Sequence, residues 1–222
     1  MKTQGHKYKI IICDDHLMFR DGLKLLLEQS NIGKVIAEAN NGKEFLNIID
    51  NYEPDIVLMD IDMPIVDGIK ATEKAIAKKP GLKILVLSMF GDERLYIEMI
   101  NAGAKGFILK TSGKNELEKA IKTVVEGESY FSNELLRKII SNIGTGNSLK
   151  DKKTSENLSL TQREMEVLKY VCSGFSTNEI AEKIALSPKT IDVYRTKLLT
   201  KTNSKNAVGL VMFAIKNKLI EI

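Results

Sequence analysis

The chain lacks any apolar segment long enough to cross a membrane. Its longest nearly unbroken hydrophobic run, Val208 to Ile215, has eight residues, whereas a membrane-spanning helix needs about 20. The polar start of the chain, MKTQGHKYK, also lacks the apolar core of a secretion signal. We therefore expect a cytoplasmic protein that has no membrane partner.

Cysteine and histidine are scarce. The two cysteines, Cys13 and Cys172, lie far apart and lack the Cys-x-x-Cys spacing of zinc and redox sites. We interpret both as buried thiols, and a disulfide between them is the less favoured alternative. The two histidines, His6 and His16, are too few for a histidine metal cluster. We assign His16 no direct role.

Length and charge distribution indicate two domains. A chain of 222 residues is longer than the roughly 100 to 200 residues of one typical domain. Its formal net charge of +4 is uneven, because residues 1–140 carry −1 while residues 158–222 carry +4. A basic part of this kind is a candidate for binding a polyanion.

Residues 7 to 126 alternate short apolar runs with segments of helical periodicity. Five runs are rich in Val, Ile or Leu, as buried parallel strands are: Tyr8–Cys13, Lys34–Ala39, Ile56–Met59, Lys83–Leu87 and Gly106–Leu109. Five segments with apolar residues three and four positions apart predict helices: Met18–Gln29, Gly42–Asn51, Gly68–Lys78, Glu93–Ala102 and Lys114–Glu126. This order predicts an α/β fold with a five-stranded, doubly wound parallel sheet.

Polar residues stand where four of these strands end, and there such sheets carry their sites. They are Asp14, Asp15, Asp60, Asp62, Ser88 and Lys110. Crowded carboxylates repel one another unless a hard cation, most simply Mg²⁺, lies among them. With a lysine and a hydroxyl beside them, they suit phosphoryl transfer to a carboxylate. Alternatively, the aspartates cap helices or lie in solvated loops. Because all six residues stand at strand ends, we favour a shared phosphoryl-transfer site over helix caps or solvated loops.

Four segments resemble the receiver domains of two-component response regulators. They are IIICDD at Ile10–Asp15, VLMDIDMPIVDG at Val57–Gly68, VLS at Val86–Ser88 and GAKGFILK at Gly103–Lys110. The resemblance implies a flavodoxin-like fold, a cognate sensor histidine kinase as partner and Asp60 as the phosphoacceptor. It also implies Mg²⁺ bound by Asp15, Asp60 and the backbone carbonyl of Asp62, with Asp14 acting mainly through water.

The same resemblance assigns three residues to a conformational switch. Lys110 would pair with the acceptor carboxylate and then with the phosphoryl group. Ser88 would move to bond a phosphoryl oxygen, and Phe107 would turn inward as Ser88 moves. Phe107 has no phenolic oxygen where tyrosine is frequent, so packing would have to carry the signal there. Taken alone, Phe107 would be interpreted as a core residue.

A linker separates the two predicted domains, which span residues 7–130 and 158–222. Residues 131–157 contain a predicted short helix, Asn133–Ile143, followed by the polar stretch GTGNSLKDKKTSENLS. A flexible tether allows the domains to pack together or separate, so phosphorylation could act by releasing one from the other.

The second domain shows three helix starts in close succession. Thr161–Glu164 and Ser176–Glu179 are capping boxes, and Ser187 precedes Pro188 at a first helical position. Their spacing suits a helix-turn-helix. With a fourth helix at Asn206–Asn217, the pattern predicts a small all-α domain of four helices.

The third of these helices presents a basic face. Ile191, Tyr194 and Leu198 can face the core. The segment Leu160 to Thr202 resembles the LuxR-type helix-turn-helix, and the whole chain resembles response regulators of the NarL/FixJ type. We therefore predict that the third helix binds double-stranded DNA in the major groove, rather than forming a solvated surface or a site for an acidic protein. The predicted contacts are Lys189, Thr190, Asp192, Val193, Arg195, Thr196, Lys197 and Lys201.

Among these contacts, Arg195, Lys197 and Lys201 are predicted to bind phosphates, whereas Lys189, Asp192, Val193 and Thr196 are predicted to meet base edges. In the family the fourth helix forms the dimer contact on DNA, which suggests Val208, Val211 and Met212; alternatively, these residues only close the core. We expect a homodimer, formed on phosphorylation, that binds a pseudo-palindromic promoter site.

Two rival functions remain open at this point. One is a DNA-binding regulator that works without phosphorylation. The other is an aspartyl-phosphate phosphohydrolase, because DIDMP at Asp60 resembles the Asp-x-Asp start of the haloacid dehalogenases. That motif normally follows the first strand, and here it follows the third. We therefore expect a regulator and not an enzyme.

Overall fold

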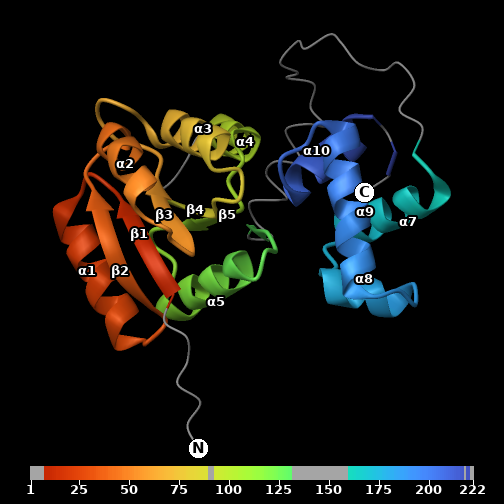
Figure 1. Ribbon diagram of the computed structural model, residues 1–222, viewed down its shortest axis with the longest axis horizontal. Helices are drawn as coiled ribbons and strands as arrows, with labels where there is room; N and C mark the ends of the chain where they lie inside the picture. Colours follow the sequence, from red (N-terminus) through yellow and green to blue (C-terminus); the bar gives the residue numbers. More distant parts are fainter. Residues whose placement is uncertain (1–7, 90–92, 132–159, 218, 221–222) are drawn as a thin grey trace, which may run out of the picture. The chain divides into compact units, whose positions relative to one another are not determined.

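The computed structural model describes residues 8–89, 93–131, 160–217 and 219–220. The chain divides into two compact units, Met1–Ser132 and Asn133–Ile222, both drawn in Figure 1. The predicted helix Asn133–Ile143 and all but the first residue of the predicted linker lie outside the described residues. No described helix is long and apolar enough to span a membrane.

The first unit is built on a parallel sheet of six strands in the order β2-β1-β3-β4-β5-β6. The strands are β1 (Tyr8–Cys13), β2 (Gly33–Ala39), β3 (Ile56–Asp60), β4 (Ile84–Ser88), β5 (Gly106–Leu109) and β6 (Tyr130–Phe131). The first five confirm the predicted strands, with ends shifted by at most one residue. The sixth was not predicted, because two residues are too few to show a period. It extends the sheet by pairing with β5.

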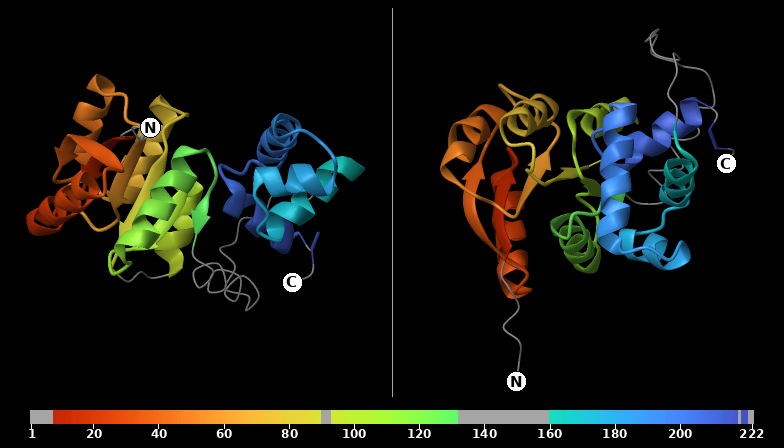
Figure 2. Two further views of the ribbon diagram at one scale, coloured as in Figure 1. Left: turned by 90° about the horizontal axis from the view of Figure 1, so that it is seen from below. Right: turned by 45° about the vertical axis from the view of Figure 1, so that its right-hand side comes forward.

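Helices cover both faces of this sheet (Figures 1 and 2). They are α1 (Leu17–Gln29), α2 (Gly42–Ile48) with a 3₁₀ turn (Ile49–Asn51), α3 (Gly68–Lys78), α4 (Glu93–Ala102) and α5 (Lys114–Val125). On one face, Leu27 of α1 and Ile121 of α5 pack against alternate strand residues such as Ile10 and Ile12. Because the intervening Ile11 is equally buried, β1 has apolar contacts on both sides, as its continuous hydrophobic run predicts.

The start of α3 lies very close to the end of β3. The Gly68 N–H donates to the Ile61 carbonyl at 2.9 Å, and a Cβ on Gly68 would overlap the carbonyl oxygen of Asp60. Asp67 caps the helix by accepting from the Lys70 N–H at 2.8 Å. Only glycine fits at position 68, because any side chain there would collide with the backbone of Asp60.

The second unit contains four described helices: α7 (Gln162–Cys172), α8 (Thr177–Lys183), α9 (Pro188–Thr202) and α10 (Ala207–Lys216). Both predicted capping boxes are present, at Thr161 and Ser176. The Ser187 side chain caps α9 by accepting from the Thr190 N–H, with Pro188 in the first turn. Buried apolar residues from all four helices form the core: Val167, Leu168, Val171, Ile180, Ala181, Ile191, Leu198, Leu210 and Ala214.

Gly68→Ala should destabilise the first unit by about 1 to 3 kcal/mol, because the added methyl group must displace backbone rather than a flexible side chain. Gly22→Ala is the matched control. Gly22 lies inside α1 with nothing near its missing Cβ, so alanine there should stabilise by about 0.5 to 1 kcal/mol. Differential scanning calorimetry of the full chain measures both; equal melting behaviour of the two variants would contradict the close approach of α3 to Asp60.

Candidate functional site

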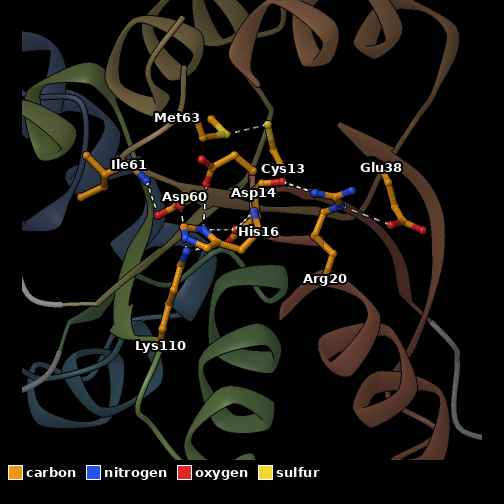
Figure 3. Close-up of polar contacts among 10 residues, drawn as sticks. Cys13, Asp14, His16, Arg20, Glu38, Asp60, Ile61, Met63 and Lys110 are labelled. Atoms are coloured by element: carbon orange, nitrogen blue, oxygen red, sulfur yellow. Dashed lines mark hydrogen bonds and ion pairs between the residues drawn. The ribbon is translucent and has the colours of Figure 1, made fainter. Parts of the chain in front are cut away.

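A buried lysine lies between two buried aspartates at the carboxyl ends of β1, β3 and β5 (Figure 3). The Lys110 Nζ is 2.6 Å from Asp14 Oδ2 and 2.7 Å from Asp60 Oδ2. All three side chains are at most 5% exposed. The structure thus brings together three of the predicted site residues, and the ammonium offsets the repulsion between the two carboxylates.

The protonation of this group follows from its burial and its contacts. Burial raises the pKa of Asp60; the hydrogen bond from Lys110 opposes the rise, and the charge of Asp14 adds to it. Burial would lower the pKa of Lys110, but its contacts with Asp14 and Asp60 outweigh that effect, and its pKa is raised. Lys110 therefore carries a positive charge at neutral pH, fixed beside the Asp60 carboxylate.

Asp15 and His16 complete an acidic cluster with Asp14 and Asp60, in which the possible ligand atoms lie within 4.8 Å of one another. Carboxylate oxygens are the hard ligands that Mg²⁺ prefers, so this donor set fits that ion. The side chain of Asp62 is exposed and is not in this group. The expected contribution of Asp62 is its backbone carbonyl, which remains a prediction.

His16 is closer to this cluster than the sequence indicated. Its Nδ1 lies 2.8 Å from Asp15 Oδ1 and 3.3 Å from Asp14 Oδ1, and its backbone N–H donates to Asp14 Oδ1 at 2.9 Å. The only signal in the sequence was its place directly after the acidic pair. His16 therefore stabilises the conformation of the two carboxylates.

Ser88 is the last residue of β4 and Phe107 is the second residue of the neighbouring strand β5; both of these predicted switch residues are 3% exposed. The Phe107 ring packs edge-on against Tyr96 of α4, with centroids 4.4 Å apart. Tyr96 was not predicted as a functional residue, because it fits the apolar period of its helix. Its ring connects Phe107 to α4.

Both cysteines are free thiols. Cys13 is fully buried beside Met63, 3.5 Å between the sulfur atoms, as predicted. Cys172 is only half-buried, so the prediction that it is a buried thiol is only partly correct. Burial raises the pKa of both thiols, that of Cys172 to about 12, so neither is a reactive thiolate at neutral pH.

The third helix of the second unit, α9, presents the predicted polar face. The exposed residues of that face are Lys189, Asp192, Val193, Thr196 and Lys197. On the opposite side, Ile191 and Leu198 are fully buried and Tyr194 packs partly buried against the core. The half-buried Thr190 shares a hydrogen bond of 2.8 Å with the Ser187 hydroxyl. The amphipathic assignment of this helix is confirmed.

Two of the predicted phosphate contacts have partners inside the domain. Arg195 donates to Thr177 Oγ1 at 2.5 Å, and Thr177 Oγ1 lies 3.3 Å from Asp192 Oδ1. Lys201 Nζ lies 2.7 Å from an oxygen of Glu164, which is buried. Of the predicted dimer residues, Val208 is buried, whereas Val211 and Met212 are partly exposed.

Comparison with known protein families gives two matches along the chain. Residues 10–122 match the response regulator receiver domain. Residues 158–214 match the family described as bacterial regulatory proteins, luxR family. The two matches therefore fall on the sheet-containing unit and on the helical unit.

Similar proteins share this arrangement over nearly their full length. The oxygen regulatory protein NreC of Staphylococcus aureus (strain MRSA252) is 37% identical over 215 residues, which are 96% of this chain and 99% of NreC. A structure of the Salmonella typhimurium response regulator RcsB is 26% identical, with a TM-score of 0.57 over 93% of this chain and 97% of RcsB. The response regulator ChrA is 26% identical, with a TM-score of 0.51 over 96% of this chain and 99% of ChrA.

The order of domains, the matched families and the identity to NreC lead to one assignment. The chain belongs to the DNA-binding two-component response regulators of the NarL/FixJ type, in which a receiver domain precedes a LuxR-type helix-turn-helix domain.

Proposed function

We propose that Mg²⁺-dependent phosphorylation of Asp60 by a cognate sensor histidine kinase controls dimerisation and promoter binding. The observation that carries this proposal is the Lys110 ammonium held between Asp14 and Asp60, with Asp15 beside them. This arrangement supplies a carboxylate nucleophile, a fixed positive charge and oxygen ligands for a divalent ion. We propose domain limits of 7–130 and 158–222, with 131–157 as the linker, although β6 of the first unit extends one residue beyond the first limit.

The chemistry places a distinct demand on each residue. The Asp60 carboxylate attacks the phosphorus atom of the kinase's phosphohistidine, the P–N bond breaks with the imidazole as leaving group, and Asp60 becomes an acyl phosphate. Asp15, Asp60 and the Asp62 carbonyl would hold Mg²⁺, which, when bound, neutralises charge on the phosphoryl oxygens. Lys110 exchanges its contact with the Asp60 carboxylate for one with a phosphoryl oxygen. The acyl phosphate carries about −1.5 to −2 charges where the carboxylate carried a single one, and Asp14 already contributes negative charge there.

The switch residues Ser88 and Phe107 would respond to the negative charge of the phosphoryl group. Ser88 bonds a phosphoryl oxygen through its hydroxyl, and Phe107 moves into the space that Ser88 leaves. Because the Phe107 ring packs against Tyr96, the movement reaches α4 through ring packing without a phenolic hydroxyl at position 107. The changed receiver surface then frees the second domain to dimerise.

DNA binding is assigned to α9. Its exposed face combines Lys189 and Lys197 with Asp192, Val193 and Thr196, a mixture that suits phosphate and base contacts in the major groove. RcsB, the solved relative described above, is reported in connection with DNA interaction. Thr190, Arg195 and Lys201 remain predicted contacts. Val208, Val211 and Met212 remain the proposed dimer contact, which would place two α9 helices on a pseudo-palindromic site.

Asp60→Asn should abolish phosphorylation and the dimerisation that depends on it, because an amide is not a nucleophile for phosphoryl transfer. The full chain would be incubated with acetyl phosphate and Mg²⁺, then analysed by phosphate-affinity gel and size-exclusion chromatography. Asp50→Asn serves as the control: Asp50 is exposed and pairs with Lys78, away from the described site.

The outcome for DNA binding separates the two regulator hypotheses. If phosphorylation raises promoter affinity of the wild-type chain and not of Asp60→Asn, the gated mechanism holds. If Asp60→Asn binds the promoter and drives output as the phosphorylated wild type does, the protein is a regulator that works without phosphorylation.

Lys189→Ala and Lys197→Ala should each weaken DNA binding, since each lysine contributes an exposed charge on α9. If a lysine contacts a phosphate, its loss should reduce the slope of log K against log salt by about 0.9. Lys169→Ala is the matched control, because Lys169 is exposed on α7. Fluorescence anisotropy with labelled promoter DNA at several salt concentrations measures affinities and slopes, and identical affinities and slopes for all three variants would reject α9 as the binding helix.

A further inference from the structure

An arginine lies buried behind the phosphorylation site. Arg20 of α1 is 6% exposed, and one of its terminal nitrogens donates to the Asp14 carbonyl oxygen at 2.6 Å (Figure 3). Its Nε lies 3.5 Å from Glu38 Oε2, which is the distance of an ion pair more than of a hydrogen bond. Since Glu38 belongs to β2, one guanidinium group contacts both β2 and the loop that follows β1.

Asp14 is held at each of its polar groups. Its N–H donates to the Ala39 carbonyl at 3.1 Å, Oδ1 accepts from the His16 N–H, and Oδ2 pairs with Lys110. The remaining group is the carbonyl oxygen, which accepts from Arg20. Asp14 is fully buried, so solvent cannot readily replace this donor. Arg20 therefore determines where the peptide group between Asp14 and Asp15 lies.

The stability of the fold does not by itself account for a buried guanidinium. Removing such a cation from water is costly, and apolar replacements of buried ion pairs are often neutral. Glu38 also has a second partner, because Lys24 Nζ donates to its other oxygen at 2.9 Å, and this hydrogen bond is the main reason that the pKa of Glu38 is lowered. Loss of Arg20 thus leaves no unpaired anion at Glu38.

We propose that Arg20 is a positioning residue for the cation-binding pair Asp14 and Asp15. The guanidinium fixes the backbone carbonyl of Asp14 and, through the shared peptide group, sets the direction of the Asp15 carboxylate. Glu38 holds the guanidinium in place from β2. This inference rests on the proposed function, since it assigns Arg20 to the Mg²⁺ site of the receiver.

Arg20→Met tests the proposal, because methionine is unbranched and fills a similar space without a donor or charge. We expect Mg²⁺ to bind the full chain about 10-fold more weakly, the lower end of the usual effect of groups that orient metal ligands. Isothermal titration calorimetry with MgCl₂ suits a chain that has no tryptophan. Amide hydrogen exchange in the absence of metal should show faster exchange at His16 and unchanged exchange in α5.

Lys24→Gln is the matched control. It removes the other cation that contacts Glu38 but leaves the Asp14 loop untouched, so Mg²⁺ affinity should stay within about twofold. Arg20→Lys keeps the charge with a single donor group, and we expect an affinity between those of the wild type and Arg20→Met. If Arg20→Met does not fold, the proposal is tested with Arg20→Lys instead, by its Mg²⁺ affinity and by the hydrogen-exchange rate of its His16 amide.

The outcomes separate this inference from the proposed function. A wild-type chain that fails to bind Mg²⁺ would overturn the proposed Mg²⁺-dependent function, whatever Arg20 does. A wild-type chain that binds Mg²⁺, with Arg20 variants that bind equally well, would overturn only the positioning role. Weaker Mg²⁺ binding by Lys24→Gln, to the same extent as by Arg20→Met, would also overturn it, because the effect would then come from Glu38.

Discussion

The shared contact of Lys110 with Asp14 and Asp60 is the interaction on which the rest of the receiver depends. Two carboxylates buried this close would be unstable without a cation between them. The parallel order of β1, β3 and β5 brings the three side chains to one edge of the sheet. Other features hold the partners in place: Gly68 permits α3 to approach Asp60, and Arg20 holds the backbone of Asp14.

Much of this site could be predicted from the sequence, because its residues directly follow apolar strands. The contact of Arg20 could not be predicted. At its position in α1 an arginine looks like an ordinary solvated cation, and only the tertiary structure shows that it is buried against Asp14 and Glu38. Tyr96 was missed for the opposite reason, since an aromatic residue at a helical period looks like core. The two-residue strand β6 has no periodicity to detect.

In the helical domain the caps were predictable, because capping boxes are local patterns of four residues. The partners of the charged side chains could not be predicted, because they lie far away in the sequence. Glu164 serves both as the last residue of its capping box and as the partner of Lys201, 37 residues away. Arg195 contacts the start of α8 through Thr177. A count of basic residues on α9 therefore does not show that Arg195 and Lys201 also have partners within the domain.

The ion pairs of Lys110 also determine when the buried site can form during protein synthesis. Lys110 is 50 residues from Asp60 in the sequence, so Asp60 leaves the ribosome before its cation does. Until β5 joins the sheet, a nascent chain carries Asp60 without the charge that completes the site. Contacts between residues so distant in sequence require loop closure and form slowly relative to local ones. The buried group of Asp14, Asp60 and Lys110 is therefore completed only after most of the sheet has been synthesised.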